Sequence, residues 1–464
     1  MNTSPLPDRL AGWLLIATCF FVFLAQWSGE SILVGAEIVT VIPAVLLLAR
    51  RTGRMQTVFL SVAGILLIAT LATRADWLTL TTSALKTTAF IAAFFTATTA
   101  LRYAATSSPA VIECGRLLAE QPPGRRYLAL TTGGHLFTLV LNYGSIALLG
   151  ALAEESSRRE DNPHIRAIRL RRMLLAIQRG FASALTWSPL AFATAISISF
   201  VPDTTWKEIL GPSLVSSLIL AVGGWLLDTL IKPKVSASPS TPVVTELSWT
   251  SIWPLPVLLV VLGVSVGGIH LATGVRATAA VILVVPIISL AWIAFQNRDD
   301  APMRHVRERT GLFVTRQLLG YRNELVLLTM AGFIGGLGGH LLSPFVLGAG
   351  FDLSSLPGWL LLVGLLWIIP AAGQLGMNPI LAVSLIAPLL PAASEVGIDA
   401  SDIAVAMTAG WALAAASSPF TASTLVVGGF GSVTARYVGL VWNGLYVVVT
   451  GLALSAWVAF LAFW

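Results

Sequence analysis

Charged residues and cysteines are scarce in this chain, and each shortage excludes a class of protein. Asp, Glu, Lys and Arg make up 11% of the 464 residues, whereas hydrophobic residues make up 56%. A soluble domain has roughly 25% charged residues, so a soluble enzyme is excluded, and so is a disordered chain. Cys19 and Cys114 lie in or beside apolar stretches and cannot build a disulfide framework or a cysteine-based metal site.

Sequence patterns for metal, phosphate or nucleophilic chemistry are missing as well. No His, Asp and Glu cluster has metal-ligand spacing, no Ser-His-Asp set stands out, and no GxxxxGK(S/T) loop occurs. We therefore expect no enzyme activity, no bound metal and no cofactor apart from a coupling ion. The net charge of +6 does not indicate a nucleic-acid partner, because the arginine runs lack interleaved aromatic residues.

Long apolar runs dominate the chain, and a membrane-crossing helix needs about 20 such residues. About 11 runs qualify, and they lie near 10–27, 32–49, 57–74, 82–101, 168–200, 209–231, 252–271, 277–296, 323–348, 402–430 and 437–462. The first run lacks a convincing signal-peptide cleavage site, so we expect it to be a retained transmembrane helix. The expected fold class is an all-α polytopic membrane protein.

Two further apolar segments are interrupted near their centres. Segment 126–153 is broken near Asn142, and segment 357–393 is broken near Asn378. Each half is too short to cross the membrane. Each segment is therefore either a helix with a polar kink or a re-entrant helical hairpin that enters and leaves by one face.

The distribution of Lys and Arg favours two re-entrant hairpins. With both segments as hairpins and a cytoplasmic N-terminus, all but Arg74, Lys86, Lys207 and Arg276 of the 28 basic residues fall on the cytoplasmic side. A single crossing by either segment would place the basic loop at 298–322 outside. We expect a multi-pass protein of the inner membrane with a cytoplasmic N-terminus and an external C-terminus.

The two halves of the chain contain related segments at an offset of 230 residues, at 180–200 and 410–430. Identical pairs at this offset are Gly180/Gly410, Ala182/Ala412, Ala184/Ala414, Ser188/Ser418, Pro189/Pro419, Thr194/Thr424 and Phe200/Phe430. Each copy follows its interrupted segment at a similar distance. Inverted repeats with discontinuous helices are a transporter architecture, with the binding site near the midplane where the repeats meet.

A polar stretch rich in Pro and Ser near the middle of the chain is typical of a flexible linker. The expected organisation is an extra N-terminal transmembrane helix at 1–31, a first repeat at 32–232 with a cytoplasmic-side hairpin, a cytoplasmic linker at 233–250, and a second, inverted repeat at 251–464 with an outer-side hairpin.

The two Ser-Pro pairs are the expected sites of chemistry. A proline inside a helix removes a hydrogen bond and clashes with the preceding turn. The helix should therefore open there, which frees carbonyls for a cation and presents a half-helix N-terminus to an anion. Neighbouring hydroxyls and the Asn residues of the hairpin tips suit a small anion together with sodium. Alternatively, the small residues only allow close helix packing.

Candidate site residues come from the hairpin tips and the helix breaks. The expected substrate contacts are Asn142, Gly144, Ser145, Thr194, Asn378, Thr421 and Thr424. The expected cation contacts are Thr186, Ser188, Pro189, Ser417, Ser418 and Pro419. Glu37 and His135 lie within apolar segments and are candidates for a proton relay, with structural hydrogen bonding or helix packing as the alternative.

This arrangement resembles the ion transporter superfamily, which includes divalent anion/sodium symporters, citrate permeases and arsenite-pump membrane proteins. The resemblance covers about residues 32–462 and consists of two inverted halves, each with a hairpin followed by an interrupted helix. An Asn near each hairpin tip and the two Ser-Pro breaks match its binding elements. The resemblance implies a homodimeric, elevator-type transporter, in which the hairpins and broken helices move against the remaining helices.

The expected function is secondary active transport of a small organic or inorganic anion across the inner membrane, coupled to sodium or protons. The expected partners are the anionic substrate, the lipid bilayer and a second copy of the chain. Two alternatives stay open. One is a membrane-embedded enzyme of surface-polymer synthesis, although the outer loops are short. The other is a channel or an assembly component.

Overall fold

The computed structural model describes residues 6–231, 253–348 and 353–463, and every regular element in these ranges is a helix. Within them, 10 helices are long and apolar enough to cross a membrane. The chain is an all-α, multi-pass membrane protein, as its composition predicts. The expected span at 168–200 is not among the 10, because irregular residues interrupt it at 185–191 and arginines occupy its first turns.

The chain forms two compact units, and each unit draws on both halves of the sequence. Unit 1 comprises Met1–Ala104, Leu262–Ser355 and Ile380–Pro391. Unit 2 comprises Ala105–Val261, Leu356–Pro379 and Ala392–Trp464. The division therefore cuts across the two sequence repeats. The expected linker at 233–250 lies outside the described residues.

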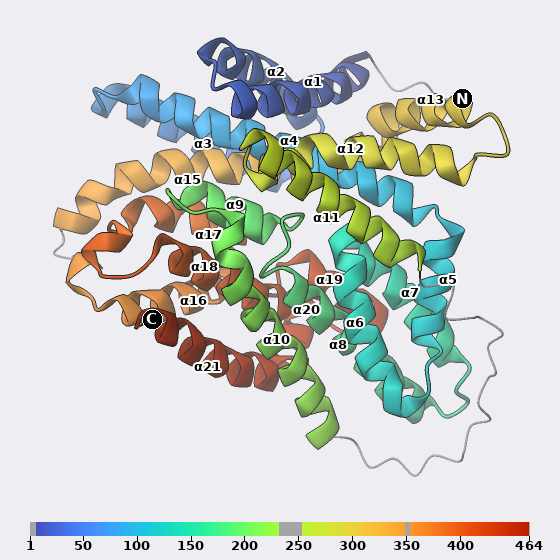
Figure 1. Ribbon diagram of the computed structural model, residues 1–464. Helices are drawn as coiled ribbons and strands as arrows, with labels where there is room; N and C mark the ends of the chain where they lie inside the picture. The colour runs from blue at the N-terminus through green and yellow to red at the C-terminus, as the bar shows by residue number, and fades with distance from the viewer. Residues whose placement is uncertain (1–5, 232–252, 349–352, 464) are drawn as a thin grey trace. The chain divides into compact units, whose positions relative to one another are not determined.

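Unit 1 is built mainly from long apolar helices. Its elements are α1 (Leu6–Ser28), α2 (Ser31–Ala49), α3 (Arg54–Thr73), α4 (Trp77–Thr106), the later part of α11 (Pro254–Thr273), α12 (Ala277–Gln296), α13 (Pro302–Leu312), a π-helical turn (Phe313–Gln317), α14 (Leu318–Gly320), α15 (Arg322–Gly348) and α17 (Pro379–Ile386). Two residues join α1 to α2, which form a tight pair (Figure 1). The α3 helix packs against α15, and α12 packs against α1 and the basic helix α13.

Unit 2 contains both Ser-Pro segments. Its helices are α5 (Pro109–Ala119), α6 (Pro123–Leu141), α7 (Gly144–Arg158), α8 (Pro163–Ala184), α9 (Phe192–Phe200), α10 (Trp206–Leu230), α16 (Gly358–Gln374), α18 (Ala400–Ser417), α19 (Ala422–Gly431), α20 (Ala435–Tyr437), a π-helical turn (Val438–Trp442) and α21 (Gly444–Leu461). Two residues join α6 to α7, which form a helical hairpin that packs against α8 (Figure 1).

Both interruptions expected in the apolar segments are present. Asn142, between α6 and α7, has a left-handed φ of 51°. Between α16 and α17 the chain turns at Gly376, which has a φ of 88°. A positive φ is strained for most residues and is tolerated by Gly and Asn, so both residue types suit the turns at which they lie. The expected hairpin at 357–393 is divided between the units, since α16 belongs to unit 2 and α17 to unit 1.

Candidate functional site

The helix opens at each Ser-Pro pair, as the sequence predicts. The α8 helix ends at Ala184 and α9 begins at Phe192, whereas α18 ends at Ser417 and α19 begins at Ala422. Ser188 and Ser418 are only 2% and 1% exposed. Each break is therefore a buried stretch of irregular backbone, whose polar groups need partners within the protein.

A glycine eight residues before the serine of each Ser-Pro pair lets the preceding helix, α6 or α16, approach the broken helix. A side chain at Gly180 would overlap the carbonyl oxygen of Thr131 on α6. A Cβ at Gly410 would lie 2.6 Å from the carbonyl oxygen of Leu366 on α16. The identity of Gly180 and Gly410 in the sequence repeat thus corresponds to the same kind of backbone contact in both halves.

Hydroxyl groups engage the carbonyls of the first break. Thr194 donates a hydrogen bond to the carbonyl oxygen of Leu185 at 3.2 Å. Thr186 donates to the carbonyl oxygen of Ser183 in the last turn of α8 at 3.0 Å, and to that of Ser213 on α10 at 3.1 Å. Ser188, followed by Pro189, accepts the backbone N–H two residues further on. In this conformation these predicted ligands cap the opened helix.

The second break is capped in a similar way. Thr421 and Thr424 both donate to the carbonyl oxygen of Ser418, at 3.0 and 2.6 Å. The Ser418 hydroxyl donates to the carbonyl oxygen of Gly373 on α16 at 2.6 Å, which ties the break to its hairpin arm. Ser417, by contrast, donates to the carbonyl four residues earlier in its own helix. Ser417 therefore contributes to helix packing here.

The first hairpin tip carries an amide oxygen that has no partner. The Asn142 Oδ1 atom is buried and accepts no hydrogen bond from the described residues. Its backbone carbonyl accepts from the Ser145 hydroxyl at 2.7 Å, just after Gly144 begins α7. An unsatisfied buried acceptor is costly, and a bound ligand with a donor would relieve that cost. Asn378 lies in the turn before α17.

A buried polar network, which sequence reasoning missed, connects the two broken helices. Arg179 on α8 donates to Asn443 Oδ1 at 3.1 Å and to the Tyr127 hydroxyl at 2.9 Å. The Asn443 amide donates to Gln178 Oε1 at 2.9 Å. Gln178 in turn donates to the carbonyl oxygen of Ala415, in the last turn of α18, at 3.3 Å. Residues from α6, α8, α18 and the start of α21 thus form one group.

Arg179 holds a positive charge in the interior of unit 2. Its side chain is 6% exposed, and its guanidinium carbon lies 4.5 Å from the centre of the Tyr446 ring. No carboxylate of the described residues forms an ion pair with it. The distribution of basic residues predicted that Arg179 lies on the cytoplasmic side, whereas the structure buries it inside unit 2. The signal that could have singled it out is its place in the apolar part of α8.

His135 takes part in a directed chain of hydrogen bonds. The Trp187 indole N–H donates to His135 Nε2 at 3.2 Å. Ser183 donates to the carbonyl oxygen of Gly180 at 2.8 Å, so its oxygen accepts from His135 Nδ1, which is 2.8 Å away. This order of donors requires the neutral tautomer with the proton on Nδ1. A second proton on Nε2 would break the contact with Trp187.

A cavity of about 380 Å³ lies beside this chain, between α6, α8 and α10. Besides apolar side chains, it is lined by His135, Ser183, Trp187 and Thr131. The Thr131 hydroxyl is buried and has no partner among the described residues. The cavity is open on the side of α10, where Leu214 and Leu218 are 45% and 61% exposed, and its mostly apolar wall carries a few polar groups.

The second candidate for a proton relay, Glu37, lies apart from this group. It is on α2 and belongs to unit 1, whereas His135 belongs to unit 2. Its side chain is 3% exposed, and no described residue makes an ion pair or a side-chain hydrogen bond with its carboxylate. Neither compact unit therefore holds both candidates.

Comparison of the sequence with protein-family models and with curated proteins finds no match. Solved structures with a similar fold include the following two. The YdaH transporter of Alcanivorax borkumensis gives a TM-score of 0.56 at 16% identity, over 88% of this chain and 99% of YdaH. MtrF of Neisseria gonorrhoeae, described as illuminating a class of antimetabolite efflux pumps, gives 0.54 at 15% identity, over 90% of this chain and 96% of MtrF. The chain therefore shares the fold of these two proteins.

Proposed function

We propose that this protein is a secondary active transporter that moves a small organic or inorganic anion across the inner membrane by an elevator-type movement. One observation carries the proposal. Both interrupted helices, and the hairpin arms α6 and α16 that pack against them, belong to the same compact unit. An elevator needs such a body to carry the site, and the long apolar helices of unit 1 supply a scaffold.

The proposal includes two inverted repeats and a homodimer, with a cytoplasmic N-terminus and an external C-terminus. Each half of the chain presents a hairpin arm, a glycine contact and a helix opened at Ser-Pro, in that order. The halves also exchange contacts, since α9 packs against α18 and α19 packs against α8. This reciprocal packing favours a binding site between the two breaks, as in transporters with discontinuous helices.

An anion fits the polar groups that converge near the breaks. The N-termini of α9 and α19 face the breaks, and helix N-termini favour negative charge. Arg179 adds a permanent positive charge inside the same unit. Both proteins that share the fold are described as transporters or pumps. The efflux described for MtrF makes export of an organic anion the first direction to test.

Sodium and protons require different changes at the site. Sodium at the second break would have to take the Ser418 carbonyl from Thr421 and Thr424, which now donate to it. A coupling proton would instead bind His135 and break its contact with Trp187. The two coupling ions therefore predict different sensitive residues.

The test is thermal melting of the purified protein with a panel of small anions, each in sodium and in potassium at matched ionic strength. A ligand at a hundredfold excess over its Kd stabilises the folded state by about 2.7 kcal/mol. We expect a melting shift with one class of anion that Asn142→Ala abolishes. Asn297→Ala, directly after α12 in unit 1, is the matched control. An unchanged melting temperature across the panel, with no anion flux in proteoliposomes, would contradict the proposal.

A further inference from the structure

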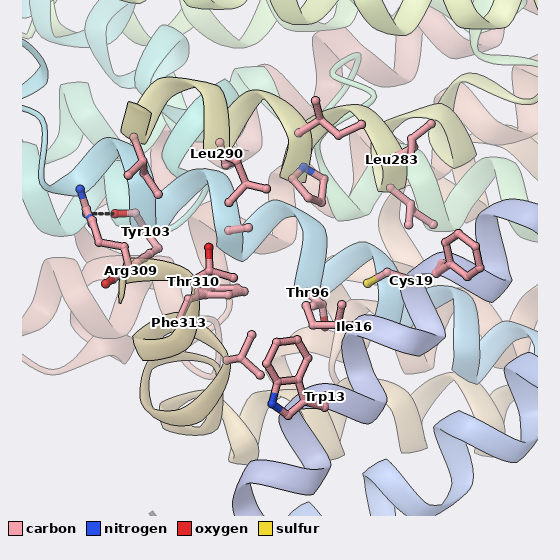
Figure 2. Close-up of a pocket in the computed structure, with 18 of the residues that line it drawn as sticks. Trp13, Ile16, Cys19, Thr96, Tyr103, Leu283, Leu290, Arg309, Thr310 and Phe313 are labelled. Atoms are coloured by element: carbon pink, nitrogen blue, oxygen red, sulfur yellow. Dashed lines mark hydrogen bonds between the residues drawn. The ribbon is translucent and has the colours of Figure 1, made fainter. Parts of the chain in front are cut away.

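Unit 1 contains an apolar cavity that has polar groups at one end (Figure 2). The cavity has a volume of about 240 Å³ and lies between α1, α4, α12, the end of α13 and the π-helical turn that follows it. Trp13, Phe20, Ile287 and Leu290 are part of its wall, and each is at least 38% exposed. The cavity therefore opens onto the apolar outer surface of the unit, which is where a membrane protein meets lipid.

The polar end is formed by Arg309 and Tyr103. The Arg309 guanidinium carbon lies 5.0 Å from the centre of the Tyr103 ring, and Arg309 also donates to the Tyr103 carbonyl oxygen at 3.4 Å. Thr310 adds a buried hydroxyl that has no partner among the described residues. Figure 2 shows these three residues at one end and Cys19 and Leu283 at the other. The cavity therefore complements an amphiphilic ligand, because its wall is apolar and one end carries the charge of Arg309.

The length of the cavity matches one leaflet of a bilayer. Its wall on α12 runs from Ile282 to Ile293, which is about 16 Å at 1.5 Å per residue. Its wall on α1 runs from Trp13 to Phe23, which is about 15 Å. Half of the hydrocarbon core is also about 15 Å. An acyl chain of a single leaflet therefore fits this length.

The charge around the polar end selects the headgroup. Six arginines and three acidic residues lie between residues 298 and 322, on and beside α13, so the segment keeps a positive net charge. Arg298, Arg304 and Arg322 form ion pairs with carboxylates. Basic residues at the membrane surface attract anionic lipids by about 1 kcal/mol each. We propose that this cavity binds one acyl chain of an anionic phospholipid, with the lipid phosphate beside Arg309. With the orientation given under Proposed function, this lipid would belong to the cytoplasmic leaflet. Only the choice of leaflet rests on that proposed function, and the binding does not.

The experiment uses delipidated, detergent-purified full-length protein with either phosphatidylglycerol or phosphatidylethanolamine. Bound lipid is counted by native mass spectrometry, and melting temperatures are measured in parallel. Arg309→Gln removes the charge, and Ala100→Phe fills the cavity. Arg304→Gln is the matched control, because Arg304 pairs with Glu308 on α13 and does not line the cavity.

We expect phosphatidylglycerol to bind in preference to phosphatidylethanolamine and to raise the melting temperature. Arg309→Gln should weaken phosphatidylglycerol binding about five-fold, Ala100→Phe should abolish it, and Arg304→Gln should leave it unchanged. If Ala100→Phe lowers the melting temperature of the lipid-free protein, Ser289→Leu is the milder filling variant. Because this readout needs no transport, its failure is distinct from failure of the proposed function.

Three results would overturn the proposal. The first is equal binding of both lipids, since the charge at Arg309 would then not favour the anionic headgroup. The second is phosphatidylglycerol binding that survives filling of the cavity in a folded variant. The third is loss of a dimer, without loss of bound lipid, on filling the cavity, because the opening would then be a subunit interface.

Discussion

His135 is positioned by two hydrogen bonds that both depend on its neutral form. Trp187 donates to one ring nitrogen, and the other donates to Ser183. The histidine also lines the cavity of unit 2, so a proton that reaches this cavity can reach the ring. Single residues of this kind can be used to test the proposed coupling ion, because a proton and a metal cation act on different groups.

Replacing His135 by glutamine should separate these possibilities. Glutamine offers one acceptor and two donors, so it can accept from Trp187 and donate to Ser183, but it does not take up a proton. If protons couple through His135, the variant should lose the pH dependence of anion uptake. His305→Gln, on α13, is the control. An unchanged pH profile in His135→Gln vesicles would exclude His135 as the coupling site.

Arg179 should be the most sensitive basic residue for stability. Arg179→Met would leave Asn443 and Tyr127 without their donor, at about 1–3 kcal/mol for each buried group. Arg179→Lys should be intermediate, because lysine keeps the charge but not the planar fork. We expect apparent melting temperatures to fall by several degrees for Met and less for Lys. Arg307→Ala, on exposed α13, should have almost no effect, and equal melting of all variants would refute the role of the network.

Close contact between backbones decides how the elements of unit 2 pack. The hairpin arms α6 and α16 each meet a broken helix where that helix has a glycine. The Ser-Pro breaks then expose carbonyls that hydroxyls of the following half-helix cap. Packing and capping therefore depend on each other, because the hydroxyls reach the carbonyls only when the helix has opened.

Alanine at Gly180 or Gly410 should destabilise the protein, although alanine normally favours a helix by about 0.5–1 kcal/mol over glycine. The added Cβ would press against a carbonyl oxygen of the hairpin arm, and overpacking of this kind costs about 1–3 kcal/mol. Gly364→Ala, on α16, is the matched control because nothing lies within 4 Å of its added Cβ. Melting of the three variants checks this, and a gain of stability in all three would contradict it.

At the scale of the whole molecule, the chain is divided between two units that each take helices from both halves of the sequence. The interrupted helices and the polar network belong to unit 2, whereas the apolar cavity with Arg309 belongs to unit 1. The candidate binding residues thus lie in unit 2, and the residues of the proposed lipid contact lie in unit 1. The elevator proposed above requires this separation, since unit 1 would stay fixed in the membrane while unit 2 moves.

Spin-label distances should report that movement. With Cys19 and Cys114 replaced by alanine, labels at Arg158 of unit 2 and Arg307 of unit 1 should give a distance distribution that shifts when substrate is added. Labels at Arg158 and Lys207, both in unit 2, are the control and should keep one narrow distance. If substrate that binds in the melting assay changes neither distance, rigid-body transport by unit 2 is wrong.

The sequence alone was sufficient for the local features of the fold. Apolar run length predicted the membrane helices, because crossing the hydrocarbon core sets a minimum length. Proline predicted the openings at Ser188 and Ser418, because proline cannot continue the hydrogen-bond ladder. The repeat identity of Gly180 and Gly410 marked the two close helix contacts. The membrane helices and the openings depend on residues that are near one another in the chain, whereas the partners of the two glycines, Thr131 and Leu366, came only from the structure.

Only the tertiary structure decided which distant groups meet. It brought Asn443 to Arg179 and Gln178, more than 260 residues away in sequence, and it turned Thr424 towards a carbonyl that sequence reasoning had left free for a ligand. It also distributed the helices of both halves between two units. Apolar periodicity says that a helix is buried but not against which partner, because dispersion and hydrophobic contacts are non-directional.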